Sequence, residues 1–239
     1  MGSMRGFGRN LRELVVVVAG ILIAFTLDAW WDGRTEAEWR QSELQSLRQE
    51  FTESRVQLEQ WIRIHEMIAD RTGIVIETLE SAPAGAAVPV PDSVLAGVLV
   101  MPTYDPTLGT LEALLASGDL SRLREPRLIS LLARWPGLVA DVREDEESVV
   151  RHVQTQLIPL LGARVDLARV QDLRRAVVGR VVRETSDSMP GTIQPLIHER
   201  AVVSSLGVNL DYHRQATGGL RELGTQIDSV LALLGAEER

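Results

Sequence analysis

The feature that most constrains this chain is a run near its N-terminus that contains no charge. Residues Leu14–Leu27 read LVVVVAGILIAFTL. Fourteen helical residues extend about 21 Å, less than a hydrocarbon core of about 30 Å. Counting from Leu11 to Trp31 gives about 31 Å, because the arginines before the run can snorkel and the Trp30–Trp31 pair suits the interface. The run therefore predicts a transmembrane helix over residues 11–31, with membrane lipid as its partner.

Two other interpretations of this run fit less well. A buried core helix of a soluble protein would not need four consecutive valines beside a tryptophan pair. A cleaved signal peptide needs small residues before the cleavage site, where this chain has Asp28, Trp30 and Trp31. We therefore expect an uncleaved signal anchor.

The charges on the two sides of the run predict its orientation. Arg5, Arg9 and Arg12 precede it, whereas four of the six charged residues between positions 28 and 40 are acidic. The positive-inside rule then makes residues 1–10 a short cytoplasmic tail. We expect a single-pass protein of the bacterial inner membrane, with its C-terminal domain outside the cytoplasm.

Two stretches carry a resemblance to a known group of proteins. GILIAFTLDAWWDGR lies in the expected anchor, and PTYDPTLGTLEALLASGDLSRLREPRLISLL begins at Pro102. Together they resemble an uncharacterised bacterial family of small single-pass membrane proteins. Its members have an N-terminal G-x-L-I-A…W-W/N-acidic-x-R anchor and a downstream Y-x-x-L…S-G-x-L helical region. The resemblance implies a membrane anchor, and the family offers no catalytic residues to carry over.

The rest of the chain is predicted to be all-α. Apolar residues make up 45% of the sequence and aromatic residues only 4%, while helix-forming residues dominate outside the linkers. Residues 36–80 form one long amphipathic helix without proline, and the Pro/Ala/Gly-rich residues 81–93 form a linker. The apolar face of that helix carries Leu44, Leu47, Phe51, Leu58, Trp61, Ile62, Ile68, Val75 and Leu79.

Residues 94–239 are expected to supply the remaining helices. Short helices are predicted near Ser93–Val100 and over Thr107–Ser117, the second beginning at Asp105–Pro106 and ending at Gly118. Glu125–Pro126 opens another helix, which Pro136 should kink or end, and the helical pattern resumes at Val139 and stops near Pro159. A further helix covers Leu167–Val182, and Thr185–Thr192 is a loop.

The last helix has a regular apolar period of threes and fours, which is typical of a coiled coil. Its stripe is Val203, Leu206, Leu210, His213, Thr217, Leu220, Leu223 or Gly224, Ile227, Leu231 and Leu234. We expect Leu206, Leu210, Leu220, Ile227 and Leu231 to pack against Leu47, Phe51, Leu58 and Trp61. The predicted fold is one transmembrane helix followed by an elongated helical bundle built on two long helices.

The residue inventory excludes several chemistries. A net charge of −8 argues against nucleic acid as a partner. Cysteine and lysine are both absent, which removes thiolate and Schiff-base sites. No two of the four histidines lie three or four residues apart, and His213 is expected to be a hydrogen-bonded core residue. The acidic run Glu144–Glu147 is expected to be a solvated helix face. We therefore predict no catalytic, cofactor-binding or metal-binding residues, and no cofactor.

These observations favour an interaction or scaffold protein without catalytic activity, whose partner is another envelope protein or the chain itself. The alternative is a sensory module of the helical-hairpin kind, signalling through a partner membrane protein. An enzyme without a recognisable motif is the less favoured third interpretation.

Overall fold

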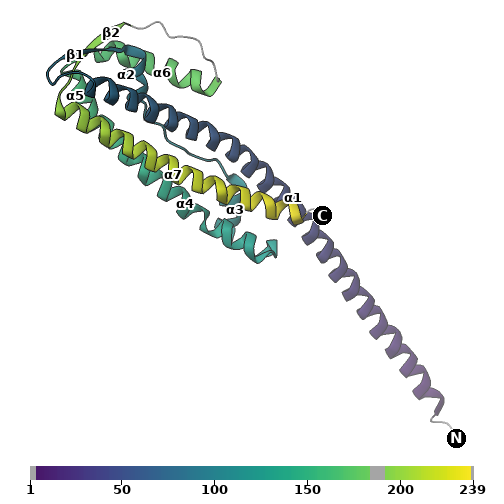
Figure 1. Ribbon diagram of the computed structural model, residues 1–239. Coiled ribbons are helices and arrows are strands. Elements are labelled where there is room, and N and C mark those ends of the chain that lie inside the picture. The colour runs from purple at the N-terminus through teal and green to yellow at the C-terminus, as the bar shows by residue number, and fades with distance from the viewer. Residues whose placement is uncertain (1–3, 184–191, 238–239) are drawn as a thin grey trace. The chain divides into compact units, whose positions relative to one another are not determined.

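The computed structural model describes the backbone of residues 4–183 and 192–237, and the side chains of residues 17–179 and 192–236. Within these residues the structure is all-helical apart from one small two-stranded sheet (Figure 1). It divides into two compact units, Met1–Leu47 and Arg48–Arg239. One helix, α1 (Met4–Glu80), supplies the first unit and continues into the second.

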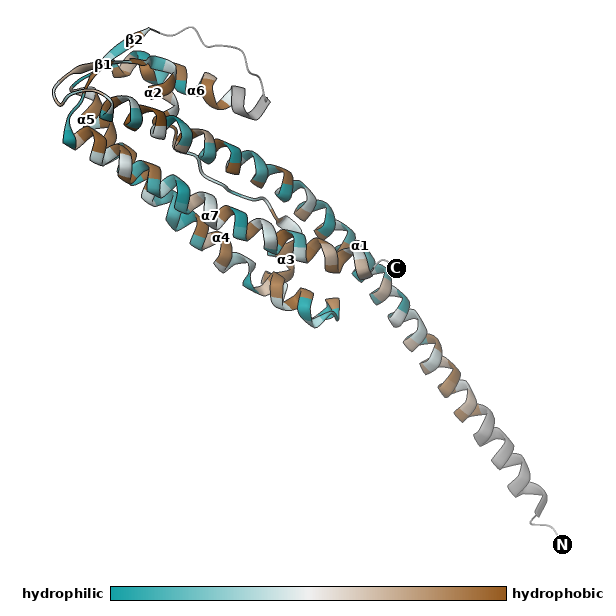
Figure 2. Cartoon of the chain, in the orientation of Figure 1, coloured by the Kyte–Doolittle hydropathy of each residue, from teal (hydrophilic) through white to brown (hydrophobic). Residues whose placement is uncertain are grey.

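The part of α1 in the first unit is rich in apolar residues, which are coloured brown in Figure 2. Nine large apolar side chains lie between Val17 and Trp31, and all are exposed. No helix among the described residues is long and apolar enough to cross a membrane. The predicted span of residues 11–31 falls partly outside the described part, since side chains are described only from Val17 onward.

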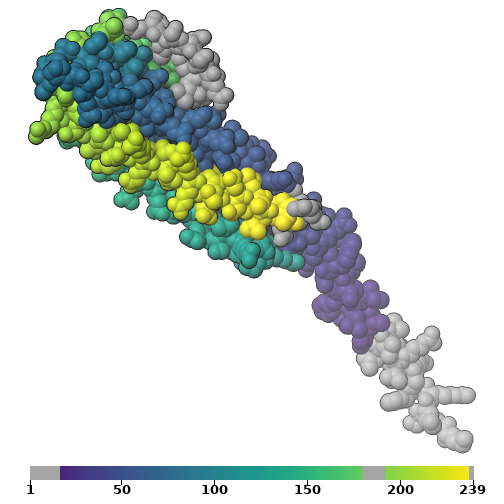
Figure 3. Space-filling model, in the orientation of Figure 1, coloured from purple at the N-terminus to yellow at the C-terminus, as the bar shows by residue number. Residues whose placement is uncertain are grey.

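The second unit is a helical bundle whose core is formed by α1 from Arg48 onward, α4 (Pro126–His152) and α7 (Arg200–Glu237). α4 and α7 pack along each other, and their surfaces adjoin in the space-filling view (Figure 3). Each of the three helices buries residues at steps of three and four, the period of a coiled-coil seam. On α1 the buried positions of this seam are Phe51, Ser54, Leu58, His65, Ile68, Thr72, Val75 and Leu79.

The seam of α7 differs by one residue from the predicted stripe at several points. Leu206, Leu220 and Ile227 are buried as predicted, but Leu210 and Leu231 are only half-buried. At two of these points the seam passes through a polar or a small residue, Asn209 and Ala216, which a count of large apolar residues overlooks. It comprises Val202, Leu206, Asn209, His213, Ala216, Leu220, Leu223, Ile227, Val230 and Leu234.

Helix α4 does not end at Pro136, contrary to one of the two predicted outcomes. It leads directly into a π-helical turn, η2 (Val153–Leu157), and then α5 (Ile158–Gly162). The wide turn has a local cause in Pro159, whose ring would clash with a carbonyl four residues earlier in a regular α-helix. The extra residue shifts the buried positions, so that the seam continues at Leu157 and Leu161.

The shorter elements between α1 and α4 largely follow the sequence. α2 (Asp92–Val98) matches its prediction, and α4 begins after Glu125, whose carboxylate accepts a hydrogen bond from Arg127 N at 3.0 Å. α3 (Gly109–Ser117) ends at Gly118, which adopts a left-handed conformation with φ 78°. η1 (Asp119–Leu123), a 3₁₀ turn, follows it.

The start of α3 was predicted incorrectly. The helix begins at Gly109 rather than at Asp105–Pro106. Its first amides are capped from a distant helix, because the Glu50 carboxylate accepts hydrogen bonds from Thr110 N at 2.7 Å and Leu111 N at 3.4 Å. Asp105 forms an ion pair with Arg143 at 2.8 Å instead. A sequence-local capping rule cannot detect a cap that arrives from another element.

The predicted linker, residues 81–93, contains the strand β1 (Ala87–Pro91) and the first residues of α2. β1 pairs in antiparallel register with β2 (Ile193–Ile197), placing Pro89 opposite Pro195. The alternating Val88 and Val90 are buried, which explains why a proline-rich segment forms a strand. The sheet lies at the end of the bundle that also holds α5 and α6 (Leu167–Arg183) (Figure 1). Most of the predicted loop Thr185–Thr192 lies outside the described residues, which resume at Thr192.

Candidate functional site

A polar layer interrupts the apolar core where the three seams meet. His65 comes from the seam of α1, Glu146 from that of α4 and His213 from that of α7, and all three side chains are fully buried. Glu146 continues the series Val142, Val149 of its own helix, at steps of four and three. Buried ionisable groups at seam positions are costly unless they are paired, so their contacts define the candidate site.

The three side chains form a chain of contacts. Nδ1 of His65 lies 3.0 Å from Nδ1 of His213, a hydrogen-bonding distance between two imidazoles. Nε2 of His65 lies 3.4 Å from Oε1 of Glu146. The Glu146 carboxylate reaches His213 only through the ring of His65. His65 is therefore the central member of the cluster.

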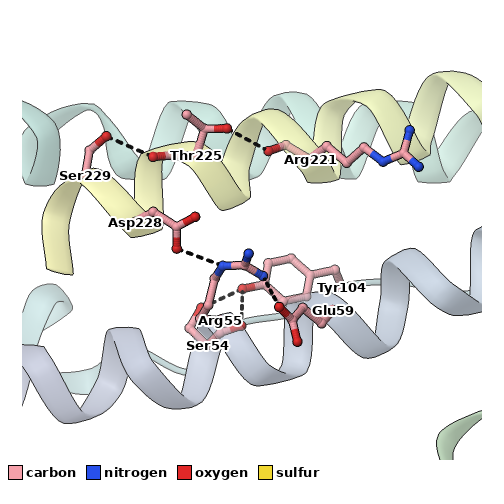
Figure 4. A network of polar contacts seen from close by, with 8 residues as sticks. All are labelled: Ser54, Arg55, Glu59, Tyr104, Arg221, Thr225, Asp228 and Ser229. Carbon is pink, nitrogen blue, oxygen red and sulfur yellow. Dashed lines mark hydrogen bonds and ion pairs between the residues drawn. The ribbon is translucent and has the colours of Figure 1, made fainter. Parts of the chain in front are cut away.

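Tyr104, in the segment between α2 and α3, holds this cluster from the side. Its backbone N–H donates to Oε2 of Glu146 at 2.8 Å. Its hydroxyl is hydrogen-bonded to the Ser54 hydroxyl at 2.6 Å, and Figure 4 shows this contact beside α1. Burial raises the pKa of Tyr104, and the nearby charge of Glu146 adds to that effect while the bond to Ser54 opposes it. One residue thus connects α1 to α4 through two buried hydrogen bonds.

Two ring nitrogens of the cluster have no hydrogen-bond partner among the described residues, Nε2 of His65 and Nε2 of His213. Nε2 of His65 still lies 3.4 Å from the Glu146 carboxylate, whereas Nε2 of His213 has no such contact. If His213 donates through Nδ1, its Nε2 is a bare acceptor, and if it accepts through Nδ1, its Nε2 carries a proton with nowhere to donate it. Neither tautomer satisfies the ring, and such a buried group costs about 1–3 kcal/mol.

The electrostatic surroundings keep His213 neutral. Burial, together with the neighbouring His65 and His152 as like charges, lowers the pKa of His213 from 6.5 to about 3. His152 lies on α4, where its Nε2 is 2.9 Å from Ser205 O and its ring contacts Tyr212 edge-on. Among the described residues, no carboxylate forms an ion pair or hydrogen bond with His213 that would favour its charged form.

A second buried polar group lies one turn away on α7. Nδ2 of Asn209 donates to Thr72 Oγ1 and to Val98 O, both at 3.4 Å. Its Oδ1 is buried without a hydrogen-bond partner in the described structure. Polar seam residues of this kind set the register of packed helices at some cost in stability. The layer therefore at least fixes how α1, α2 and α7 align.

Ion pairs reinforce the outer edges of the contact between α1 and α7. Arg55 Nε donates to Asp228 Oδ1 at 2.9 Å and its Nη1 donates to Glu59 at 2.8 Å (Figure 4). The hydrogen bond to Asp228 raises the pKa of Arg55. Further along, Arg221 pairs with Glu66 at 2.6 Å. These exposed pairs contribute little energy each, and they favour the antiparallel alignment of the two helices.

The surface of the second unit carries a shallow groove of about 210 Å³ beside α3 and α4. Its lining is mostly apolar and also includes the charged residues Asp105, Glu112 and Arg143. The apolar lining residues are Pro106, Leu108, Leu111, Leu115, Trp135, Pro136 and Val139. The groove is separate from the buried polar layer, which is closed to solvent.

Sequence reasoning found part of this arrangement. His213 is a hydrogen-bonded core residue, as predicted. The acidic run Glu144–Glu147 was predicted to be a solvated face, and this is wrong for Glu146, which is fully buried. The burial of Glu146 is indicated by its spacing, because it lies four residues after Val142 and three residues before Val149, which are both buried. The partnership of His65 and His213 could not be read from spacing, because 148 residues separate them.

The chemistry available to the cluster is limited by its closure. Within the described ranges, no group of three or more histidine, cysteine, aspartate or glutamate side chains is placed to hold a metal ion. A fully buried set of imidazoles and one carboxylate can exchange protons among its members, but it cannot contact a substrate without the helices separating. Proton binding is therefore the chemistry that the arrangement best supports.

Comparison with known proteins finds no matching family model, no similar curated protein and no similar solved structure.

Proposed function

We propose that this chain is a membrane-anchored helical interaction protein without catalytic activity. Its N-terminal segment, residues 11–31, lies in the bacterial inner membrane with residues 1–10 in the cytoplasm. The bundle from Arg48 onward lies outside the cytoplasm and contacts another envelope protein or a second copy of the chain. The observation that carries the proposal is the exposed apolar surface of α1.

That surface surrounds the helix. Successive residues of an α-helix turn by about 100°, so the nine exposed apolar residues from Val17 to Trp31 point in all directions. A helix that packs against protein on one side would instead keep a polar face toward water. An apolar surface on every side is what a lipid environment requires.

The polar groups of this segment also suit lipid. The Thr26 hydroxyl donates to Ile23 O at 2.8 Å, so it needs no water as a partner. Arg34 lies over the ring of Trp30 at 5.9 Å and pairs with Glu38 at 2.9 Å, which places charge and aromatic surface together at one end. Such a combination is typical of a membrane interface.

The absence of catalysis is proposed from the closure of the polar layer. His65, Glu146 and His213 are the buried groups best placed for proton chemistry, and all are sealed within the core. The apolar groove beside α3 and α4 offers a surface for a partner rather than a set of reacting groups.

Topology and membrane insertion can be tested together. A C-terminal alkaline phosphatase fusion should be active, and a C-terminal green fluorescent protein fusion exported in unfolded form should be dark. The full chain should remain in membranes after a carbonate wash. An inactive phosphatase with a bright fluorescent fusion would overturn the topology, and release by carbonate would overturn the anchor.

A sensory module that signals through a partner membrane protein is the second candidate. The continuity of α1 favours it, because the same helix contains the exposed apolar segment and His65 of the core. A change in the core would then act on a helix that leads into the membrane. Cross-linking in intact cells should capture a second membrane protein, whereas a scaffold that binds itself should capture only another copy.

A further inference from the structure

We propose that the His65–His213 contact is an acid-sensitive latch, which holds α7 against α1 and opens when both rings carry a charge. The proposal concerns the response of the bundle to protons, which is separate from its topology. Which compartment supplies the acid rests on the proposed function. The opening itself is a property of the chain.

The geometry accommodates one proton in addition to those of two neutral rings, but it does not accommodate two. A cationic His65 can donate from Nε2 toward Glu146 and from Nδ1 to the bare Nδ1 of His213. If His213 is also a cation, both Nδ1 atoms carry hydrogens, and two donors face each other across 3.0 Å. The second proton therefore converts a hydrogen bond into a repulsive contact.

No neighbour offsets that second charge. Among the described residues, His65 of α1 contacts His213 directly, and His152 of α4 acts on it as a like charge. Glu146 of α4 contacts His65, and Tyr104 of the segment before α3 contacts Glu146. His65 and His152 oppose a charge on His213, and Tyr104 is directed to Ser54 and Glu146. Glu146, the only carboxylate that the described residues contribute to the layer, is already in contact with His65.

The sign of the pH effect follows from the burial of His213. In the closed bundle the pKa of His213 is about 3, and in an opened bundle it returns toward 6.5. The neutral ring therefore favours the closed form fully above about pH 6.5, and this preference is lost as the pH falls toward 3. Between pH 7.5 and 4.5 the closing equilibrium should fall roughly 90-fold from this ring alone.

A static register lock is the competing interpretation of the same contacts. A polar layer that only aligns the helices would lose stability when mutated, but it would not make the separation of α1 and α7 depend on pH between 7.5 and 4.5. The test must therefore read the distance between these helices as a function of pH rather than stability at one pH.

The chain has no cysteine, so two introduced cysteines give two unique labels. Spin labels at Asp70→Cys on α1 and Arg214→Cys on α7 report their separation in the purified full chain, since both positions are exposed. We expect one narrow distance distribution at pH 7.5, a longer and broader one at pH 4.5, and recovery when the pH is raised. An unchanged distribution at pH 4.5 would overturn the latch.

His213→Leu, which cannot be charged, should keep the distance distribution short at pH 4.5. The matched control is His198→Gln, because His198 contacts Ala82 O at 2.7 Å away from the polar layer and should leave the opening unchanged. Opening of His213→Leu at the same pH as the parent would contradict the proposal.

A measurement on the unmutated chain covers the case in which His213→Leu does not fold. Nitrogen NMR of ¹⁵N-histidine-labelled chain should show the His213 ring neutral at pH 5 while the bundle is closed. A charged His213 ring in the closed bundle would equally exclude the latch. These measurements use purified protein, so they are independent of the fusion test of topology.

Discussion

Two regions of one helix, α1, use apolar residues in opposite ways. Between Val17 and Trp31 the large apolar side chains are exposed, whereas from Phe51 to Leu79 most are buried along one seam and only isolated ones such as Val56 are exposed. The backbone is α-helical throughout both regions. Helix formation therefore does not distinguish them, and only the distribution of apolar residues around the axis does.

The difference teaches that periodicity distinguishes a helix region that packs in a protein core from one that does not. The buried region repeats every three or four residues and accepts polar groups such as Ser54, His65 and Thr72 at seam positions. The exposed region has no such period, and its polar residues include Thr26, which bonds to its own backbone, and the exposed Asp28. One region packs within protein, and the other has the apolar surface on which the proposed membrane anchor rests.

The largest expected effect comes from a matched pair of phenylalanines in α1. Phe51 is 0% exposed and its ring lies 4.9 Å from that of Trp135, whereas Phe25 is 67% exposed. Phe51→Ala should lower the free energy of unfolding by about 3–5 kcal/mol, because it removes buried contacts and leaves a cavity. Phe25→Ala should change it little. Chemical denaturation of the full chain in detergent measures both, and equal losses would break the comparison.

The second effect concerns membrane insertion, which should depend on the exposed region of α1 and not on the buried one. Leu22 and Val56 are similarly exposed, at 59% and 55%. Leu22→Arg should disfavour membrane insertion by about 2.5–3.5 kcal/mol, since an arginine in mid-bilayer is costly. Val56→Arg should leave the membrane-bound fraction unchanged. Fractionation of cells that express each variant provides the measurement, and membrane loss with Val56→Arg alone would contradict the assignment.

A smaller effect is expected from one buried hydroxyl. Tyr104→Phe removes the 2.6 Å hydrogen bond to Ser54 and leaves a buried hydroxyl without this partner, which should cost about 1–3 kcal/mol. Tyr212→Phe is the matched control, because Tyr212 contacts His152 through its ring, which phenylalanine retains. Urea denaturation of the two variants should separate them. Equal stability would mean that the seam tolerates unpaired polar groups.

The smallest effect concerns the exposed ion pairs of the two regions. Asp228→Asn weakens the 2.9 Å contact with Arg55 and should cost about 0.2–1 kcal/mol at low salt, falling as salt screens the pair. Glu38→Gln weakens a pair within one turn of α1 and should leave the stability of the bundle unchanged. A salt titration of the unfolding midpoint distinguishes them, and a salt-independent loss at Asp228 would indicate lost packing instead.

The sequence predicted what depends on local pattern. The long helices, the start of α4 at Glu125 and the end of α3 at Gly118 all follow from caps and periods that lie within a few residues. The start of α3 does not follow from the local pattern, because the carboxylate that caps it belongs to Glu50 of another helix. The buried state of Glu146 and its link to His65 also depend on neighbours distant in sequence. Apolar counting further missed Asn209 and Ala216, where the seam uses a polar or a small residue.

The small sheet bears on how the chain avoids unwanted association. In an antiparallel pair of strands, hydrogen-bonded and non-hydrogen-bonded residue pairs alternate. Asp92 N donates to Thr192 O and His198 N donates to Ala86 O, so these two pairs are hydrogen-bonded. The non-hydrogen-bonded pairs are therefore Ala87–Ile197, Pro89–Pro195 and Pro91–Ile193. In a two-stranded sheet, the backbone N–H groups of non-hydrogen-bonded pairs point away from the partner strand. Three of these positions are prolines, Pro89, Pro91 and Pro195, which have no N–H to donate to a further strand.

Both free edges of the sheet thereby lose hydrogen-bond donors without any loss of pairing between β1 and β2. A shift of register by one residue would place a proline in a bonding position and turn Val88 and Val90 outward. The same three residues thus fix the alignment of the ribbon and discourage edge-to-edge aggregation with other chains.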